Sequence, residues 1–184
     1  KVFVRDGSYI TPLSEKWRQS RRGRLTASGG ANAIVPFGDR GIATLVKKLR
    51  AELQPDWKWK ELNLPQLDWG RAYESAALAS VELALGAEVI EPGTMFHPRR
   101  SYCSATPDGL IDGHITLQIK CPHKPSIHLD TFYNKTIKPA YYRQIHWESW
   151  CAGADQIIFA SFDPQQPLAT RLVMIDVPID TELI

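Results

Sequence analysis

An aspartate, a glutamine and a lysine are spaced so that one β-hairpin would bring them together. Asp108 begins a short apolar run, Asp112 and Gly113 follow it, and Gln118 and Lys120 lie in the next apolar run. Asp-Gly between two alternating apolar runs predicts a two-residue hairpin turn. Because side chains alternate along a strand, Gln118 and Lys120 share one face, and Asp108 is expected beside them. An acid followed by acid-x-Lys across a hairpin is typical of a metal-dependent nuclease site, although residue 118 is here an amide.

The chemistry of such a site is hydrolysis of a phosphodiester. Carboxylates hold one or two divalent ions, Mg²⁺ or Mn²⁺, which take oxygen ligands. The backbone carbonyl of Ile119 is a further candidate ligand, and the Lys120 ammonium would orient the water or stabilise charge on phosphorus. A polar-x-Lys pair also occurs on strands whose polar face meets solvent, so the hairpin alone leaves both interpretations open.

A short basic segment lies near the N-terminus. Residues 16–24 hold five basic side chains and no acidic one, whereas the whole chain has a net charge of only +2. Such a segment is either a solvated helix face or a contact for phosphate groups.

Composition predicts an ordinary globular protein. The 184 residues are 43% hydrophobic and 23% charged, which fits a single domain over residues 1–184. No apolar stretch approaches the length of a membrane span, so no membrane partner is expected. The three cysteines have no Cys-x-x-Cys spacing, which favours a reducing, cytoplasmic location over a disulfide framework or a zinc site.

Hydrophobic periodicity and capping residues predict a mixed α/β domain, in which helices flank a central mixed β-sheet. Ser14 is a candidate N-cap of the first helix. Helices are expected over residues 12–22, near 28, over 41–53, 69–85 and 139–152, with a loop over 54–68. Strands are expected over residues 94–97, 101–122 as a hairpin, 156–162 and 170–177.

Five segments together resemble one known family. They are RRGRLTAS (21–28), WGRAYE (69–74), TPDG (106–109), LQIKCP (117–122) and YYRQ (141–144). Their order resembles that of the lambda exonuclease/YqaJ phage alkaline exonucleases, which belong to the PD-(D/E)xK nucleases and have a restriction-endonuclease-like core. The resemblance implies a Mg²⁺-dependent 5′→3′ exonuclease that degrades one strand of duplex DNA from an end. It also implies a toroidal homotrimer and a partner that anneals single strands.

The resemblance assigns the metal and catalytic positions. Asp108 matches the first metal carboxylate, Gln118 takes the place of the second, and Lys120 matches the catalytic lysine. Ile119 would contribute its carbonyl. Glu74 matches an acid that reaches the metal site from the preceding helix, although a solvated helix-face carboxylate remains the alternative.

The resemblance also assigns the DNA contacts. Arg21 matches the arginine that binds the 5′-phosphate, with the hydroxyl of Ser28 as its partner at a helix start. Thr106 lies near Asp108 in sequence and would donate to the same phosphate.

Three further side chains match the family's DNA contacts less specifically. Gln144 and Tyr141 correspond to the last motif, which contacts DNA or the attacking water, and packing is the alternative for the tyrosine. Trp17 would stack on an end base pair or pack as a core residue.

Residue 118 departs from the family, because glutamate is expected there. A neutral amide is a weaker ligand, so we predict reduced or absent cleavage with retained DNA binding. Two explanations stay open: a deliberate Glu→Gln change that traps uncut DNA, which the otherwise complete motifs favour, or a natural member that only binds ends. A restriction-type endonuclease is a third hypothesis.

Overall fold

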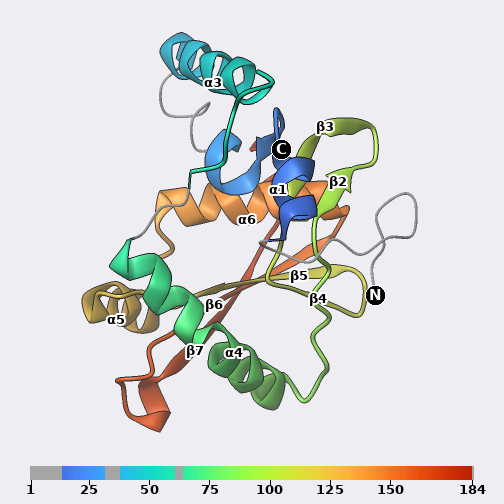
Figure 1. Cartoon of the computed structure of the whole chain (residues 1–184). Helices are drawn as coiled ribbons and strands as arrows, with labels where there is room; N and C mark the ends of the chain where they lie inside the picture. Colours follow the sequence, from blue (N-terminus) through green and yellow to red (C-terminus); the bar gives the residue numbers. More distant parts are fainter. Residues whose placement is uncertain (1–13, 32–37, 61–63, 184) are drawn as a thin grey trace.

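The computed structural model describes residues 14–31, 38–60 and 64–183, which build two β-sheets with helices around them (Figure 1). The larger sheet is ordered β4-β5-β6-β7, with bounds Gly109–Ile111, Ile115–Lys120, Gln156–Phe162 and Leu172–Val177. β5 and β6 are parallel and the other pairs antiparallel, so the sheet is mixed. The smaller sheet is ordered β1-β3-β2, with bounds Leu25–Thr26, Arg100–Ala105 and Met95–His97.

The helices pack around these sheets and between them. The α-helices are α1 (Glu15–Arg21), α3 (Gly38–Glu52), α4 (Pro65–Leu85), α5 (Pro125–Asn134) and α6 (Pro139–Ala152). A π-helical turn, η1, spans Ala27–Ala31, and a 3₁₀ turn, η2, spans Leu168–Thr170.

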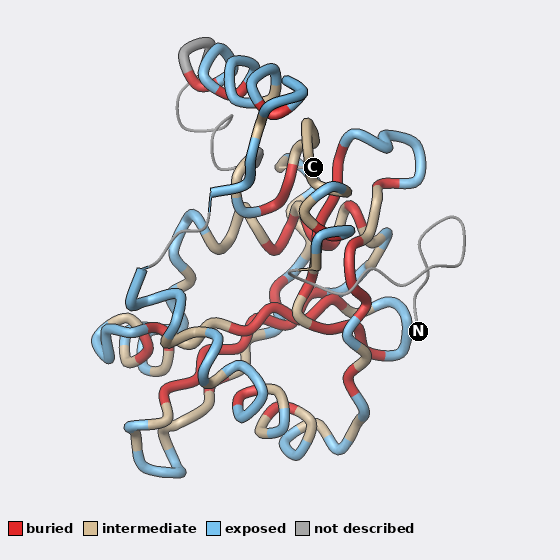
Figure 2. The backbone as a smooth tube through the Cα atoms, viewed as in Figure 1, coloured by how far each residue is buried: buried red, intermediate tan, exposed pale blue. Residues whose placement is uncertain are grey.

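The larger sheet has two apolar faces because side chains alternate along its central strands. On one face, Val81 of α4 packs with Leu117 and Ile119 of β5. On the other face, Ile145 of α6 packs with Phe159 of β6. Buried residues accordingly concentrate along the strands (Figure 2).

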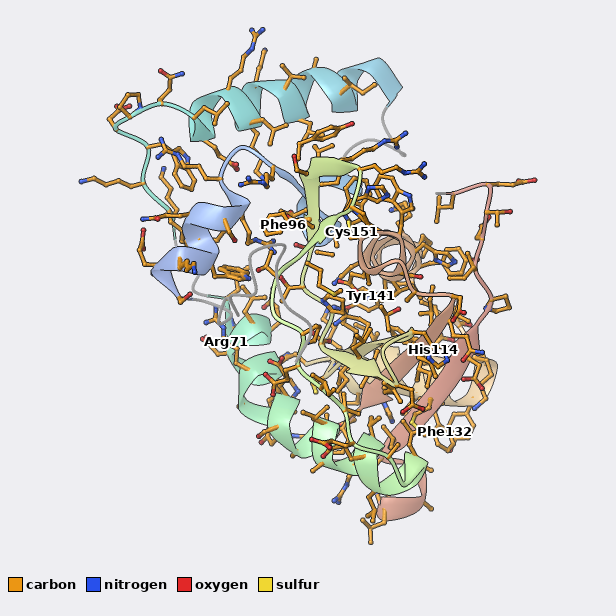
Figure 3. All side chains as sticks on the ribbon, turned by 90° about the vertical axis from the view of Figure 1, so that its right-hand side faces the viewer. Arg71, Phe96, His114, Phe132, Tyr141 and Cys151 are labelled. Atoms are coloured by element: carbon orange, nitrogen blue, oxygen red, sulfur yellow. The ribbon has the colours of Figure 1, made fainter. Side chains whose placement is uncertain are left out.

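Helix α6 connects the two sheets. Its Cys151 packs with Cys103 and Ala105 of β3 in the smaller sheet. Figure 3 shows the arrangement from the side, with Cys151 of α6 and Phe96 of β2 in the upper part of the view and Phe132 of α5 in the lower part. A helix that contacts both sheets can position side chains against each of them.

Most predicted elements are confirmed, and the differences have local causes. Ser14 caps α1 by accepting a hydrogen bond from the Trp17 N–H at 3.1 Å, while residues 12 and 13 lie outside the described part. The helix predicted near residue 28 is the short π-helical turn. Helix α4 begins at Pro65 instead of residue 69, because proline at a first turn needs no N–H partner.

One prediction was wrong in extent, and one helix was not predicted. The hairpin expected over residues 101–122 is limited to β4 and β5, because β3 leaves to join the smaller sheet. Helix α5 was not expected, because its ten residues are too few to give a strong apolar periodicity. The predicted central mixed sheet flanked by helices is nevertheless confirmed. Among the described helices, none has the length and apolar character needed to cross a bilayer.

Candidate active site

The hairpin predicted at Asp112 and Gly113 forms, but its loop has three residues, 112–114, instead of the predicted two, because Ile111 pairs with Ile115. Asp112 and Gly113 have positive φ angles of 51° and 78°, as a type I′ turn requires. The resulting register pairs Gly109 with Leu117. Asp108, which immediately precedes β4, therefore lies beside the second half of β5.

Gly109 is needed where β4 begins. A Cβ atom there would lie 2.2 Å from Cγ1 of Val89, which is far inside van der Waals contact. The missing side chain lets the backbone approach Val89 and holds the preceding Asp108 against β5.

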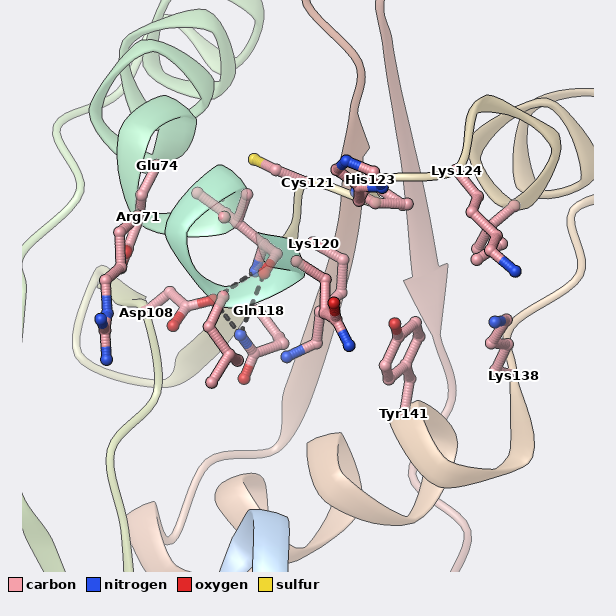
Figure 4. A pocket seen from close by; sticks show the side chains of 16 residues that line it. Arg71, Glu74, Asp108, Gln118, Lys120, Cys121, His123, Lys124, Lys138 and Tyr141 are labelled. Atoms are coloured by element: carbon pink, nitrogen blue, oxygen red, sulfur yellow. Dashed lines mark hydrogen bonds between the residues drawn. The ribbon is translucent and has the colours of Figure 1, made fainter. Parts of the chain in front are cut away.

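The polar groups of Asp108, Gln118 and Ile119 contact one another directly (Figure 4). The Ile119 N–H donates to Asp108 Oδ2 at 2.6 Å. Gln118 is 3% exposed, and its Nε2 donates both to Asp108 Oδ2 and to the Ile119 carbonyl. With Lys120, these residues form what we term the hairpin cluster. The amide nitrogen of Gln118 thus lies between two oxygens that the sequence predicted as metal ligands.

Burial makes Asp108 a weak acid. Its pKa is raised to about 7, mainly because the carboxylate is removed from water. The nearby Lys120 ammonium and the Ile119 N–H oppose this shift. The carboxyl group would therefore ionise fully only under alkaline conditions or beside a cation.

A cavity of about 850 Å³ opens beside the hairpin cluster. Arg71 and Glu74 of α4 lie on one side of it and Tyr141 of α6 on the other (Figure 4). The Lys120 ammonium lies 5.2 Å from the ring centroid of Tyr141. The basic residues that line the cavity include Arg71, Lys120, Lys124 and Lys138. The cavity therefore combines the carboxyl groups of Asp108 and Glu74 with cations that suit the phosphates of a nucleic acid.

Glu74 faces this cavity from α4, as the sequence predicted. Its side chain is solvent-exposed at the cavity wall, yet the surrounding protein displaces enough water to raise its pKa. The neighbouring carboxylate of Glu91 raises it further, whereas Lys120 and Arg71 oppose the shift. Glu74 is thus an additional acid close to Asp108.

Helix α6 contributes a polar pair behind Gln118. Gln144 Nε2 donates to Gln118 Oε1 at 2.9 Å and to Glu148 Oε1 at 2.7 Å. Glu148 is 2% exposed, and burial raises its pKa to about 8. The sequence prediction included Gln144 but missed Glu148. Its spacing of four residues from Gln144, on a helix that was predicted, was the available signal.

A second group, the arginine cluster, joins Arg21, Trp17 and Thr106. The Arg21 guanidinium lies 4.4 Å from the Trp17 ring centroid. Trp17 Nε1 donates to Thr106 Oγ1 at 3.3 Å, which links α1 to the segment before Asp108. Burial lowers the pKa of Arg21 to about 10, against the raising effect of Glu148 and Glu52.

Trp17 and Ser28 differ in exposure. Trp17 is only 9% exposed and also contacts Trp59 at 5.8 Å between ring centroids. Ser28 is exposed on η1. Trp17 thus packs against Arg21 in the interior, while Ser28 lies at the surface.

Tyr141 and Tyr142 take different roles on α6. The ring of Tyr141 stacks on Phe159 at 6.1 Å and lines the cavity. Tyr142 instead packs on His146 and donates to Asp180. Only the first tyrosine is available to a substrate in the cavity.

The donor atoms suit a hard divalent cation. The described residues contain no group of three or more His, Cys, Asp or Glu side chains arranged to hold a metal. They do offer oxygens from Asp108, Glu74 and the Ile119 carbonyl, which Mg²⁺ prefers, whereas Gln118 Oε1 accepts a hydrogen bond from Gln144. Glu148 Oε2 is also buried, and it has no hydrogen-bond partner among the described residues. These residues fit one such ion better than two, because residue 118 carries no charge.

Comparison with known proteins decides the family. A sequence model described as YqaJ-like viral recombinase domain matches residues 16–155. The chain belongs to this family. The matched range contains all five segments on which the sequence prediction depended, so the predicted YqaJ/lambda exonuclease-like membership is confirmed. Among curated protein sequences, no relative matches the chain.

Solved structures agree with the YqaJ assignment. An alkaline exonuclease from Laribacter hongkongensis, LHK-Exo, is 26% identical, with a TM-score of 0.78 over 92% of this chain and 84% of that chain. The same enzyme in complex with dAMP matches equally well, covering 92% and 85%. A phage related exonuclease from Haemophilus somnus shares the fold at 14% identity and a TM-score of 0.69, covering 87% and 86%. The PD-(D/E)xK-type core is therefore confirmed, and this YqaJ-family chain is of the alkaline exonuclease type.

Proposed function

We propose that this protein is a divalent-metal-dependent 5′→3′ exonuclease for linear duplex DNA. It would start at a 5′-phosphorylated end, release mononucleotides and leave a single strand for phage-type recombination. The observation that carries the proposal is the convergence of Asp108, the residue-118 side chain, the Ile119 carbonyl and Lys120 on one cavity. The structural likeness to an alkaline exonuclease, which also forms a complex with the mononucleotide dAMP, supports it.

The hairpin cluster would perform the cleavage. A bound Mg²⁺, or Mn²⁺, would neutralise phosphate charge and supply an activated water. Asp108, Gln118 and the Ile119 carbonyl would hold that ion, with Glu74 nearby. Lys120 would orient the water or stabilise the charge that develops on phosphorus.

The arginine cluster would hold the 5′-phosphate. Arg21 supplies a planar cation, which stays largely protonated at neutral pH because its lowered pKa is still about 10. Thr106 and Ser28 would donate hydroxyl hydrogen bonds, and Trp17 would keep the guanidinium in place. Such charge-assisted contacts would draw each new 5′-end forward after a cut.

The remaining polar residues would contact the DNA strand and the water. Tyr141 lies beside Lys120 in the cavity, and Gln144 contacts residue 118. Tyr141 would contact the DNA strand, and Gln144 would contact the DNA or the attacking water.

We further propose that residues 1–184 act as one domain, assembled as a toroidal homotrimer beside a single-strand annealing protein. A cytoplasmic location fits the three cysteines, none of which forms a disulfide in the described structure. Sizing in solution would test the trimer.

The decisive experiment restores the acid at position 118. Gln118→Glu should release mononucleotides from a 5′-phosphorylated linear duplex in Mg²⁺ at least about 100-fold faster than the unsubstituted chain. The double variant Gln118→Glu/Asp108→Asn is the matched control and should be inactive. A 5′-hydroxyl duplex should be degraded slowly and a closed circle left intact. Degradation of the circle would instead support a restriction-type endonuclease.

A non-catalytic role in binding DNA ends is the second candidate. It is favoured by the Gln118 amide, whose nitrogen contacts both Asp108 and the Ile119 carbonyl. If Gln118→Glu releases no nucleotides while the chain still prefers 5′-phosphorylated ends, the exonuclease proposal fails and the end-binding role stands.

A further inference from the structure

Glu148 is a buried carboxylate whose environment is incomplete. Its side chain is 2% exposed, and Oε1 accepts one hydrogen bond, from Gln144. Oε2 is buried and has no hydrogen-bond partner in the described part of the chain. A buried carboxylate without a full set of donors is costly, although the charges of Lys120 and Arg21 offset part of that cost here. Such a group suggests that a positive ligand completes its surroundings.

The position of Glu148 relative to residue 118 indicates which ligand. One nitrogen, Gln144 Nε2, donates both to Glu148 Oε1 and to Gln118 Oε1. The carboxylate of Glu148 also interacts electrostatically with Lys120, Asp108 and Arg21. Glu148 is therefore an acidic group on the α6 side of Gln118, and Asp108 is the acidic group on the other side, and a bound cation would favour the ionised form of each.

The charges of these groups explain why that arrangement matters. Gln118 replaces the acid expected on β5, so that position supplies no charge to a cation. Glu148 is linked to Gln118 through Gln144, whose side chain donates a hydrogen bond to both. Glu148 lies on α6, which packs against β5. From α6, Glu148 is close enough to interact electrostatically with Asp108 and Lys120.

We propose that Glu148 provides, from α6, the second negative charge of the divalent-cation site that residue 118 lacks. The inference deepens the proposed function, because it rests on a hard divalent cation binding at the hairpin cluster. It implies that the chain binds such an ion more tightly than its single hairpin carboxylate would suggest.

The test measures Mn²⁺ binding without DNA, by calorimetry or by the electron paramagnetic resonance of unbound Mn²⁺. Glu148→Gln should weaken Mn²⁺ affinity by about 10- to 100-fold, as is typical for groups that support metal ligands. Gln118→Glu should strengthen it. The exchange variant Gln118→Glu/Glu148→Gln should return close to the unsubstituted chain, since it moves the charge without removing it.

Matched variants separate charge from structure. Asp155→Asn removes one exposed acid just past the end of α6 and should leave Mn²⁺ affinity unchanged. Glu148→Asp keeps the charge and should bind within a few-fold of the unsubstituted chain. Glu148→Met, of similar volume, should lose the same Mn²⁺ affinity as Glu148→Gln. It serves as the uncharged variant if Glu148→Gln does not fold.

Two results would overturn the inference. Equal affinity in Glu148→Gln and Asp155→Asn would mean that Glu148 contributes no charge to the ion. Tighter binding in Glu148→Gln would mean that the Glu148 carboxylate opposes binding of the ion. Neither measurement depends on cleavage. If Gln118→Glu releases no nucleotides but Mn²⁺ binding still depends on Glu148, the exonuclease proposal fails and the inference about Glu148 stands.

Discussion

The hairpin cluster and the arginine cluster are assembled in different ways. The hairpin cluster comes from residues 108–120, which one tight turn brings together. The arginine cluster joins α1 to Thr106, 89 positions beyond Trp17 in the chain. By the sequence resemblance, the hairpin cluster departs from the expected pattern at residue 118, whereas the arginine cluster fits it. Under the proposed function, a single side-chain change would therefore alter cleavage while the contacts to a DNA end stay intact.

Glu148 lies between these two regions. It interacts electrostatically with Arg21 as well as with Asp108 and Lys120. Substitutions that affect one cluster alone test whether the two are separable, and substitutions at Glu148 test how they are coupled.

The largest effect is expected at Lys120. In the Gln118→Glu background, Lys120→Met should lower the cleavage rate by about 10²- to 10⁴-fold, because the ammonium acts on charge that develops during the reaction. Its affinity for a 5′-phosphorylated duplex should change little. A single-turnover assay beside a binding assay measures both quantities. An equal loss of binding and cleavage would mean that the two clusters do not act separately.

A second prediction concerns pH. The pKa values of Asp108 and Glu148 are raised to about 7 and about 8, so both groups are largely protonated at pH 6. A cation must displace those protons, hence Mn²⁺ affinity should rise by about 100-fold or more between pH 6 and pH 9.

Titration of Mn²⁺ binding at several pH values measures this slope. Glu148→Gln should flatten the upper part of the curve, since it removes the group that ionises last. A pH-independent affinity would show that these carboxyls take no part in binding.

The arginine cluster should give a smaller effect. Arg21→Gln should reduce the preference for a 5′-phosphate over a 5′-hydroxyl duplex by about 10- to 100-fold, the loss of a charge-assisted contact. Lys16→Gln removes an exposed charge from the same segment and should weaken the binding of both duplexes equally. Competition binding without metal measures the preference, and an unchanged ratio would remove Arg21 from the phosphate site.

The smallest effect concerns stability in the absence of metal. Because burial raises the pKa of Glu148 above its unfolded value, its ionisation destabilises the fold progressively as pH rises from about 4.5 toward 8. Glu148→Gln should therefore be more stable than the unsubstituted chain at pH 9, by about 1–3 kcal/mol, and lose that advantage near pH 4.

Thermal unfolding at the two pH values measures the difference, at about 2–4 °C per kcal/mol for a chain of this size. A lower melting temperature for Glu148→Gln at pH 9 would mean that the carboxylate is stabilising in place.

Local sequence signals were sufficient for the hairpin and for several helix ends. The Asp-Gly pair predicts the positive φ angles of Asp112 and Gly113, since these residue types tolerate the left-handed region, although the loop has one residue more than predicted. Glycines 86 and 153 end α4 and α6 in left-handed conformations, as their positions after apolar helices predict. Helix α5 escaped prediction because its short length carries weak periodicity, and packing on β6 and β7 stabilises it.

The sequence by itself determined the hairpin, the faces of β5 and the family, because turn chemistry, strand alternation and ordered motifs are local properties of the chain. Only the tertiary structure decided that Glu148 lies behind Gln118, that the Gln118 amide nitrogen contacts Asp108, and that Arg21 rests on Trp17. Those contacts join segments far apart in sequence, and burial, which sets the charge state of each carboxyl group, exists only once the helices have packed on the sheet.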